Sequence, residues 1–323
     1  MTLAKPHTPY TPAGVIPACL LPFNPDLSID EPSFRKHLRD VVAVEGLSAI
    51  TINAHATEVA SCTFEEQERV HAITMDEVGD RIPVVHGVYA DGSLEAARIA
   101  RMAERGGASC LLVFPPNPLG LGSHARPEMA IAHFKAIAAA SSLPIIAFQY
   151  PLANGLGYPV DTLMRLVEAV PSIRAIKDWS NNVAQHERQI RLLQSLPRPV
   201  TVLTTHSAWL LSSLVLGCGG LLSGSGSVIA DLQVALFQAV RDNDLQRARR
   251  LNDRIYPVAR AFYADPFVDM HNRMKEALVM LGRIPCAAVR PPLVKLPAAE
   301  ISAIAAALKE AGVSKEGTLA LAA

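Results

Sequence analysis

Short apolar runs rich in β-branched residues alternate with longer amphipathic segments from residue 14 to about residue 240. The runs have the length of strands, and the segments between them repeat their apolar residues with the period of a helix. Such an alternation is typical of parallel βαβ units with buried strands. Eight units predict a closed (β/α)₈ barrel, the TIM barrel. The predicted strands span residues 15–21, 48–53, 83–88, 109–114, 144–150, 173–177, 200–204 and 220–223.

A doubly wound open sheet is the alternative arrangement of these units. The Gly-rich turn that binds a dinucleotide in that fold is missing after the first predicted strand, which favours the barrel. Asp30 and Ser93 are predicted helix N-caps. From residue 231 onward the strand pattern stops, and segments such as HNRMKEALVMLG indicate helices. We expect an N-terminal arm (1–13), the barrel (14–230) and a C-terminal helical extension (231–323) packed on it.

The composition excludes several classes of function. Thirty Lys and Arg residues balance thirty Asp and Glu residues, so no broad basic field would attract nucleic acid or an anionic membrane. No stretch of about twenty apolar residues predicts a membrane span, and the first residues lack the apolar core of a signal peptide. Five scattered cysteines without a C-x-x-C pair argue against disulfides and a zinc cluster. We expect a soluble cytoplasmic protein that recognises a small molecule.

Functional groups in such a barrel project from the carboxyl ends of the strands. Lys177 closes the apolar run IRAIK, where poor solvation would lower the pKa of its ammonium group. The resulting neutral amine could attack a carbonyl group. Alternatively, Lys177 pairs with Asp178 or reaches solvent at the rim. The polar residues at or near the strand ends are Asn53, His55, His86, Tyr150, Lys177, Thr205, His206 and Ser223.

Tyr150 ends the strand before that of Lys177, so both side chains would emerge from adjacent strands at the same face. A phenol in this position could relay protons while a carbinolamine forms and a hydroxyl or alkoxide departs. The alternative for Tyr150 is a packing role with a satisfied hydroxyl.

Motifs along nearly the whole chain resemble the pyruvate-dependent class I lyases that include dihydrodipicolinate synthase and N-acetylneuraminate lyase. The opening GVIPACLLPF is similar to a family segment in which threonine usually stands at the position of Leu21. AHATE at 54–58 occupies the place of the family's G-T-T-G-E loop, and AFQY and AIKDWS resemble its tyrosine and lysine strands. LGCGGLLSGSGSV and VRPPL resemble its eighth strand and its C-terminal signature.

This resemblance implies a homotetramer, or its constituent dimers, that acts on pyruvate or another small 2-oxo acid without a cofactor or metal. Lys177 would be the Schiff-base lysine and Tyr150 the proton shuttle. The backbone N–H groups of His55 and Ala56 would bind the substrate carboxylate. Glu58, Ser223 and Arg290 occupy family motif positions, with Ser223 among the substrate-binding residues, and His206 lies where contacts with the substrate tail vary.

Three departures separate the chain from a typical dihydrodipicolinate synthase. His55 and Ala56 replace the paired hydroxyl residues, so a hydroxyl that relays protons to the tyrosine is missing. The segment 115–118 reads PPNP where the family has P-Y-Y-N, so the tyrosine that enters a neighbouring subunit is also missing. Gly155 lies where the synthase has an arginine for its aldehyde co-substrate. These departures argue against a lysine-biosynthetic synthase, and His55 is either a replacement proton relay or a structural residue.

Three other interpretations remain open from the sequence. The glycine-rich segment GCGGLLSGSGS could bind a phosphate through its backbone, although close packing around the lysine site explains it as well. His55, Glu58, His86 and His206 could bind a metal in a carbonyl lyase, but no tight H-E-x-x-H or H-x-H spacing supports this. A non-catalytic barrel that binds 2-oxo acids is the non-enzymatic alternative. A Schiff-base aldolase or dehydratase is the preferred hypothesis.

Overall fold

The computed structural model describes residues 10–315 together with residues 317 and 318. Its central feature is a sheet of eight parallel strands in the order β1-β8-β7-β6-β5-β4-β3-β2. Bridges between Val15 and Leu47 and between Ala18 and Thr51 join β1 to the segment of β2, which closes the barrel. The strands are β1 (Gly14–Pro17), β2 (Ile50–Ile52), β3 (Val84–Val88), β4 (Cys110–Val113), β5 (Ile145–Gln149), β6 (Ile173–Asp178), β7 (Thr201–Thr204) and β8 (Gly220–Ser223).

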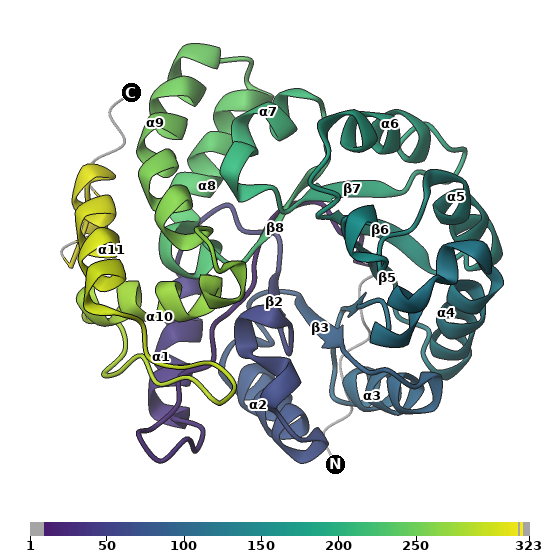
Figure 1. Cartoon of the computed structure of the whole chain (residues 1–323), viewed down its shortest axis with the longest axis horizontal. Helices are drawn as coiled ribbons and strands as arrows, with labels where there is room; N and C mark the ends of the chain where they lie inside the picture. Colours follow the sequence, from purple (N-terminus) through teal and green to yellow (C-terminus); the bar gives the residue numbers. More distant parts are fainter. Residues whose placement is uncertain (1–9, 316, 319–323) are drawn as a thin grey trace.

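The predicted (β/α)₈ barrel is therefore confirmed, and the open doubly wound sheet is wrong. Each of the eight barrel strands overlaps a predicted one, because short runs of buried apolar residues suit a parallel sheet that is covered on both faces. Figure 1 shows the helices arranged as a ring around the strands. The ring consists of α1 (Glu31–Val42), α2 (Phe64–Val78), α3 (Ser93–Arg105), α4 (Glu128–Ala140), α5 (Val160–Ala169), α6 (Val183–Leu193), α7 (Leu210–Val215) and α8 (Gly226–Arg241).

Local signals in the sequence set several helix starts. Asp30 caps α1 as predicted, since its carboxylate accepts a hydrogen bond from the N–H of Ser33 (3.1 Å). Ser93 is not an N-cap: Gly92 holds that position, and the Ser93 hydroxyl lies 3.0 Å from His133 Nδ1 instead. Thus Ser93 connects α3 to α4, and its side chain is not available to the first turn.

The C-terminal helices gather on one side of the barrel in Figure 1. They are α9 (Leu245–Phe262), α10 (Met270–Met280) and α11 (Ala298–Glu310), followed by a small antiparallel pair, β9 (Val313–Ser314) and β10 (Gly317–Thr318). The expected boundary at residue 230 falls inside α8, one residue after a kink at Ile229 (φ −127°, ψ 40°). Residues 1–9 of the expected arm and residues 316 and 319–323 of the extension lie outside the described part.

Candidate active site

Lys177 lies near the carboxyl end of β6, and only 5% of its surface is exposed. Its Nζ lies 4.1 Å from the ring centre of Phe148 on the adjacent strand β5. Asp178 instead accepts hydrogen bonds from the Ser180 N–H (2.7 Å) and pairs with His186 Nδ1 (2.6 Å). Because burial penalises the ammonium form, the pKa of Lys177 falls from 10.5 to about 7. Roughly half of the amine is therefore neutral near pH 7.

The Tyr150 hydroxyl lies 2.8 Å from His55 Nε2, directly after β5. Burial, together with the nearby Lys177, lowers the pKa of His55 to about 3, so its imidazole is neutral at physiological pH. Burial also raises the pKa of Tyr150, which keeps the phenol protonated. It follows that the phenol donates to Nε2 and that the imidazole proton lies on Nδ1.

The short 3₁₀ helix η1 (His55–Thr57) follows β2 and lies beside the lysine. The Thr57 hydroxyl fixes this loop, because it accepts the Ala54 N–H (2.6 Å) and donates to the Ala54 carbonyl (2.8 Å). The first N–H groups of a helix have no acceptor within it. Among the hydrogen bonds of the described residues, none engages the N–H of His55 or Ala56. These two groups are thus available donors at the wall of the lysine cavity.

An inner cavity surrounds Lys177, and the C-terminal extension supplies part of its wall. Gly224 permits this closure, since a Cβ atom there would lie 2.9 Å from His271 Nε2 of α10. Burial holds the pKa of His271 well below its ordinary value. The inner cavity is lined by Ala18, Ala54, His55, Ala56, Phe148, Lys177, Trp179, Thr205 and Gly224, and from the extension by Tyr263, Phe267, Met270 and His271.

The four lining residues from the extension were missed by the sequence analysis. They lie in or beside helices, where a strand-end rule does not look, and helical periodicity does not reveal which helix contacts the barrel mouth. Trp179 was also missed, although its position two residues after Lys177 was a usable signal. Its ring stacks on Phe267 with centroids 5.1 Å apart and planes at 15°.

Outside the inner cavity lies an outer cavity of about 510 Å³ that shares several walls with it. Tyr150, Trp179 and His271 line the outer cavity from the side of the lysine site. The outer cavity is further lined by His55, Glu58, Val59, Ala60, Ser61, Tyr89, Asn117, Asn154, Phe267, Val268, Met270, Arg290, Pro291, Pro292 and Leu293. The outer cavity therefore lies directly beside the cavity of the lysine.

A buried ion pair connects the η1 loop to the extension. Lys275 of α10 pairs with Glu58, and its Nζ also donates to the Ala288 carbonyl (2.9 Å). The second Glu58 oxygen accepts the Arg290 N–H (3.1 Å). The Arg290 side chain forms a bidentate pair with Glu66 of α2 (2.6 and 2.7 Å). The family-motif residues Glu58 and Arg290 thus hold the cavity wall in place and do not face the lysine.

His206 and Ser223 lie near the site, but neither lines the inner or the outer cavity. His206 Nε2 accepts the Asn181 N–H (3.0 Å), and its ring stacks on Trp209. The Ser223 hydroxyl lies 3.0 Å from that of Ser207, which is 3.0 Å from the Tyr263 hydroxyl. Ser223 therefore reaches the cavity through Tyr263. A direct substrate contact by either residue remains a prediction.

The four residues proposed for a metal site have separate partners. His86 Nδ1 lies 3.0 Å from His71 Nδ1 of α2, while His55, Glu58 and His206 are engaged as described above. Within residues 10–315 and 317–318, no group of three or more His, Cys, Asp or Glu side chains is arranged to hold a metal ion. The glycine-rich strand is explained by close packing, because a Cβ at Gly220 would lie 2.2 Å from the Gly14 carbonyl oxygen.

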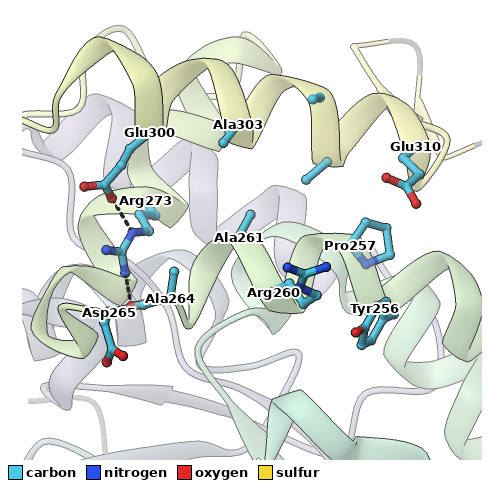
Figure 2. A pocket seen from close by; sticks show the side chains of 12 residues that line it. Tyr256, Pro257, Arg260, Ala261, Ala264, Asp265, Arg273, Glu300, Ala303 and Glu310 are labelled. Carbon is cyan, nitrogen blue, oxygen red and sulfur yellow. Dashed lines mark hydrogen bonds and ion pairs between the residues drawn. The ribbon is translucent and has the colours of Figure 1, made fainter.

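A hollow of about 470 Å³ between α9 and α11 lies in the extension, and Figure 2 shows its lining. Arg273 crosses it to pair with Glu300 (2.8 Å) and donates to the Ala264 carbonyl (2.6 Å). Alanines form much of its wall, and none of the residues assigned to the lysine site lines it. The catalytic candidates therefore belong to the barrel mouth.

The fold is that of the (β/α)₈-barrel enzymes, and the buried lysine lies at the strand ends, where such enzymes bind their substrates. Residues 11–311 match the sequence model of the Dihydrodipicolinate synthetase family. The chain belongs to this family and is a lyase of the dihydrodipicolinate synthase-like type. The family supports a Schiff-base lyase or synthase in general. No helix among the described residues is long and apolar enough to cross a bilayer.

Similar proteins cover nearly the same length. The 4-hydroxy-tetrahydrodipicolinate synthase of Dechloromonas aromatica is 30% identical over 93% of this chain and 98% of its own. That of Maridesulfovibrio salexigens is 27% identical, with the same coverage. The structure of YagE, an Escherichia coli prophage protein solved in complex with pyruvate, has a TM-score of 0.85 at 24% identity, covering 93% of this chain and 98% of YagE. This structural likeness confirms the fold.

Proposed function

We propose that the protein forms a Schiff base between Lys177 and pyruvate or a similarly small 2-oxo acid, and that it makes or breaks a bond next to the imine. The observation that carries this proposal is the buried Lys177 amine, with its pKa near 7, in the inner cavity, next to the outer cavity that Tyr150 lines. An imine withdraws electrons from the adjacent carbon, so the reaction requires no further electron sink.

The neutral Lys177 amine attacks the keto carbon and gives a carbinolamine, which loses water to form the imine. Tyr150 supplies the proton to the departing hydroxyl and later returns protons to carbon or oxygen. The free N–H groups of His55 and Ala56 bind the substrate carboxylate. YagE, whose structure contains pyruvate, supports a 2-oxo acid of this size for the present chain.

His55 takes the place of the missing hydroxyl relay in this proposal. Its Nε2 accepts the Tyr150 proton at 2.8 Å, and its neutral ring is a suitable acceptor. Because burial disfavours the imidazolium, His55 holds the Tyr150 proton only transiently and returns it to the phenol as the substrate reacts. A solely structural histidine would not require Nε2 to face the catalytic phenol.

Borohydride trapping tests the proposal. Pyruvate and borohydride should add one adduct to the wild-type protein, mapped by peptide mass spectrometry to Lys177. Lys177→Ala should lose the adduct, while Lys135→Ala, at an exposed lysine of α4, should keep it. An adduct on another lysine, or one retained by Lys177→Ala, would refute the assignment. Turnover of trapped substrate then separates an enzyme from a barrel that only binds 2-oxo acids.

Assembly and compartment are part of the same proposal. We propose a homotetramer or its constituent dimers in the cytoplasm, with the 2-oxo acid as its small-molecule partner and no nucleic acid partner. The even charge balance supports the last point.

A further inference from the structure

The residues that line the outer cavity indicate which kind of second substrate it could bind. Beyond the lysine, the co-substrate would contact Tyr150, Trp179 and Phe267, whose rings form a continuous aromatic surface. The Tyr150 and Trp179 centroids are 5.2 Å apart with their planes at 64°, and Trp179 stacks on Phe267. Aromatic walls in these orientations favour an apolar aromatic ligand, through edge-to-face and offset contacts.

The charged residues of the outer cavity are already engaged. Glu58 pairs with Lys275, so it presents no free charge. Arg290 has five N–H donors, and all are used: Nε and one Nη2 donor by the Leu27 carbonyl, one Nη1 donor by the Ser61 carbonyl, and the other two by Glu66. No guanidinium donor remains for a carboxylate or phosphate.

The histidines of the cavity add no positive charge, because burial lowers the pKa of both His55 and His271. Of the side chains that line the outer cavity, none is therefore a free cation. An anionic tail placed there would lose hydration without gaining a partner, which is costly. The remaining polar groups include the amides of Asn117 and Asn154, which suit an uncharged hydrogen-bonding group.

We propose that the co-substrate is an uncharged aldehyde with an aromatic ring, an inference that rests on the Schiff-base function proposed above. Tyr150, left as the phenolate once it has protonated the departing hydroxyl, takes a methyl proton from the Lys177–pyruvate imine and so converts it to an enamine. The terminal carbon of the enamine bonds to the aldehyde carbon. The aldehyde C=O π bond breaks, and its oxygen takes the proton of Tyr150. Hydrolysis of the imine releases a 4-hydroxy-4-aryl-2-oxobutanoate, and the reverse sequence cleaves this product to pyruvate and the aldehyde.

Two aldehydes that differ in one charge test the inference. With saturating pyruvate, the kcat/KM for benzaldehyde should be at least about 100-fold above that for 4-carboxybenzaldehyde. Mass spectrometry of the aldol product measures both rates. Cyclohexanecarbaldehyde, which is apolar but not flat, should react more slowly than benzaldehyde. A preference for 4-carboxybenzaldehyde, or equal rates with the cyclohexyl compound, would overturn the inference.

Matched variants show whether the outer cavity is responsible. Val268 lines it and is 64% exposed, so Val268→Arg adds a cation there without disturbing the core. This change should reduce the preference for benzaldehyde over 4-carboxybenzaldehyde at least tenfold. Val294→Arg, at a 71% exposed residue outside the lining, should leave it unchanged. An unchanged preference in Val268→Arg would overturn the inference.

The pyruvate adduct separates this inference from the proposed function. Trp179→Leu should lower kcat/KM for benzaldehyde by roughly tenfold relative to wild type. Val294→Arg, which lies outside both cavities, should keep the adduct at Lys177. An adduct together with preferred use of carboxylated aldehydes would overturn only the aromatic co-substrate. If the wild-type protein forms no adduct with pyruvate, both the proposed Schiff-base function and the aromatic co-substrate are refuted.

Discussion

Replacing Lys177 by methionine should stabilise the protein near pH 7 and abolish its activity. Methionine is similar in length and is apolar, so it suits a site where only 5% of the lysine surface is exposed. The folded-state pKa of Lys177, about 7, lies below its ordinary value of 10.5. Between these values the unfolded chain binds more protons than the folded protein, so this group makes wild-type stability rise with pH.

The size of the effect follows from the shift of roughly 3.5 pKa units, at about 1.36 kcal/mol per unit. Allowing for the half-neutral amine at pH 7, the lysine costs the folded state about 4 kcal/mol at pH 7 and about 2 kcal/mol at pH 9. The stability advantage of Lys177→Met should therefore shrink by about 2 kcal/mol between pH 7 and pH 9. Groups common to both proteins cancel in this comparison.

Urea unfolding at pH 7, 8 and 9, monitored by circular dichroism, measures the difference. Lys135→Met, at an exposed lysine of α4, is the matched control and should follow the wild-type protein at every pH. If the free energies of unfolding of Lys177→Met and wild type changed in parallel with pH, the lysine would have an ordinary pKa when folded. The activation argument for the amine would then be wrong.

Three further predictions follow from the contacts around the site. His55→Ala should lower kcat by about 10²–10⁴-fold and largely spare adduct formation. His124→Ala, at an exposed histidine, should change neither kcat nor adduct formation, and an unchanged kcat in His55→Ala would reject the relay. Lys275→Met should destabilise the protein by about 3–5 kcal/mol because it leaves Glu58 buried without its cation, and adding Glu58→Gln should restore most of the lost stability. Denaturant midpoints measure the single and the double variant, and a Lys275→Met protein as stable as wild type would contradict the argument. Sedimentation at micromolar concentration should give a tetramer or dimer, and a monomeric mass would refute the predicted assembly.

The barrel could be predicted from the sequence because each of its strands is marked by neighbouring residues in the chain. Each buried strand is a short apolar run, and eight such runs leave few other arrangements. Lys177 and Tyr150 could be selected in the same way, since they end adjacent strands whose carboxyl ends share a face. The kink at Ile229 and the first helix position of Ser93 could not, because a boundary shift of a few residues changes little in the apolar pattern.

The rest of the site depends on contacts between distant segments. The pairing of Glu58 with Lys275 joins residues 217 positions apart, and no periodicity encodes it. His206 is another such case: the family resemblance suggested a contact with the substrate tail, which remains a prediction, whereas the bond of its Nε2 to the Asn181 N–H could not be foreseen. Strand position determines which face a residue is near, whereas packing determines the direction of its side chain.

The wall that α10 contributes has a consequence for the order in which the protein is made. All eight barrel strands leave the ribosome before His271 and Lys275 are synthesised, so the lysine-bearing strand precedes the part that encloses it. The wall that encloses Lys177 is therefore complete only when the last part of the chain has been made and lies against the barrel.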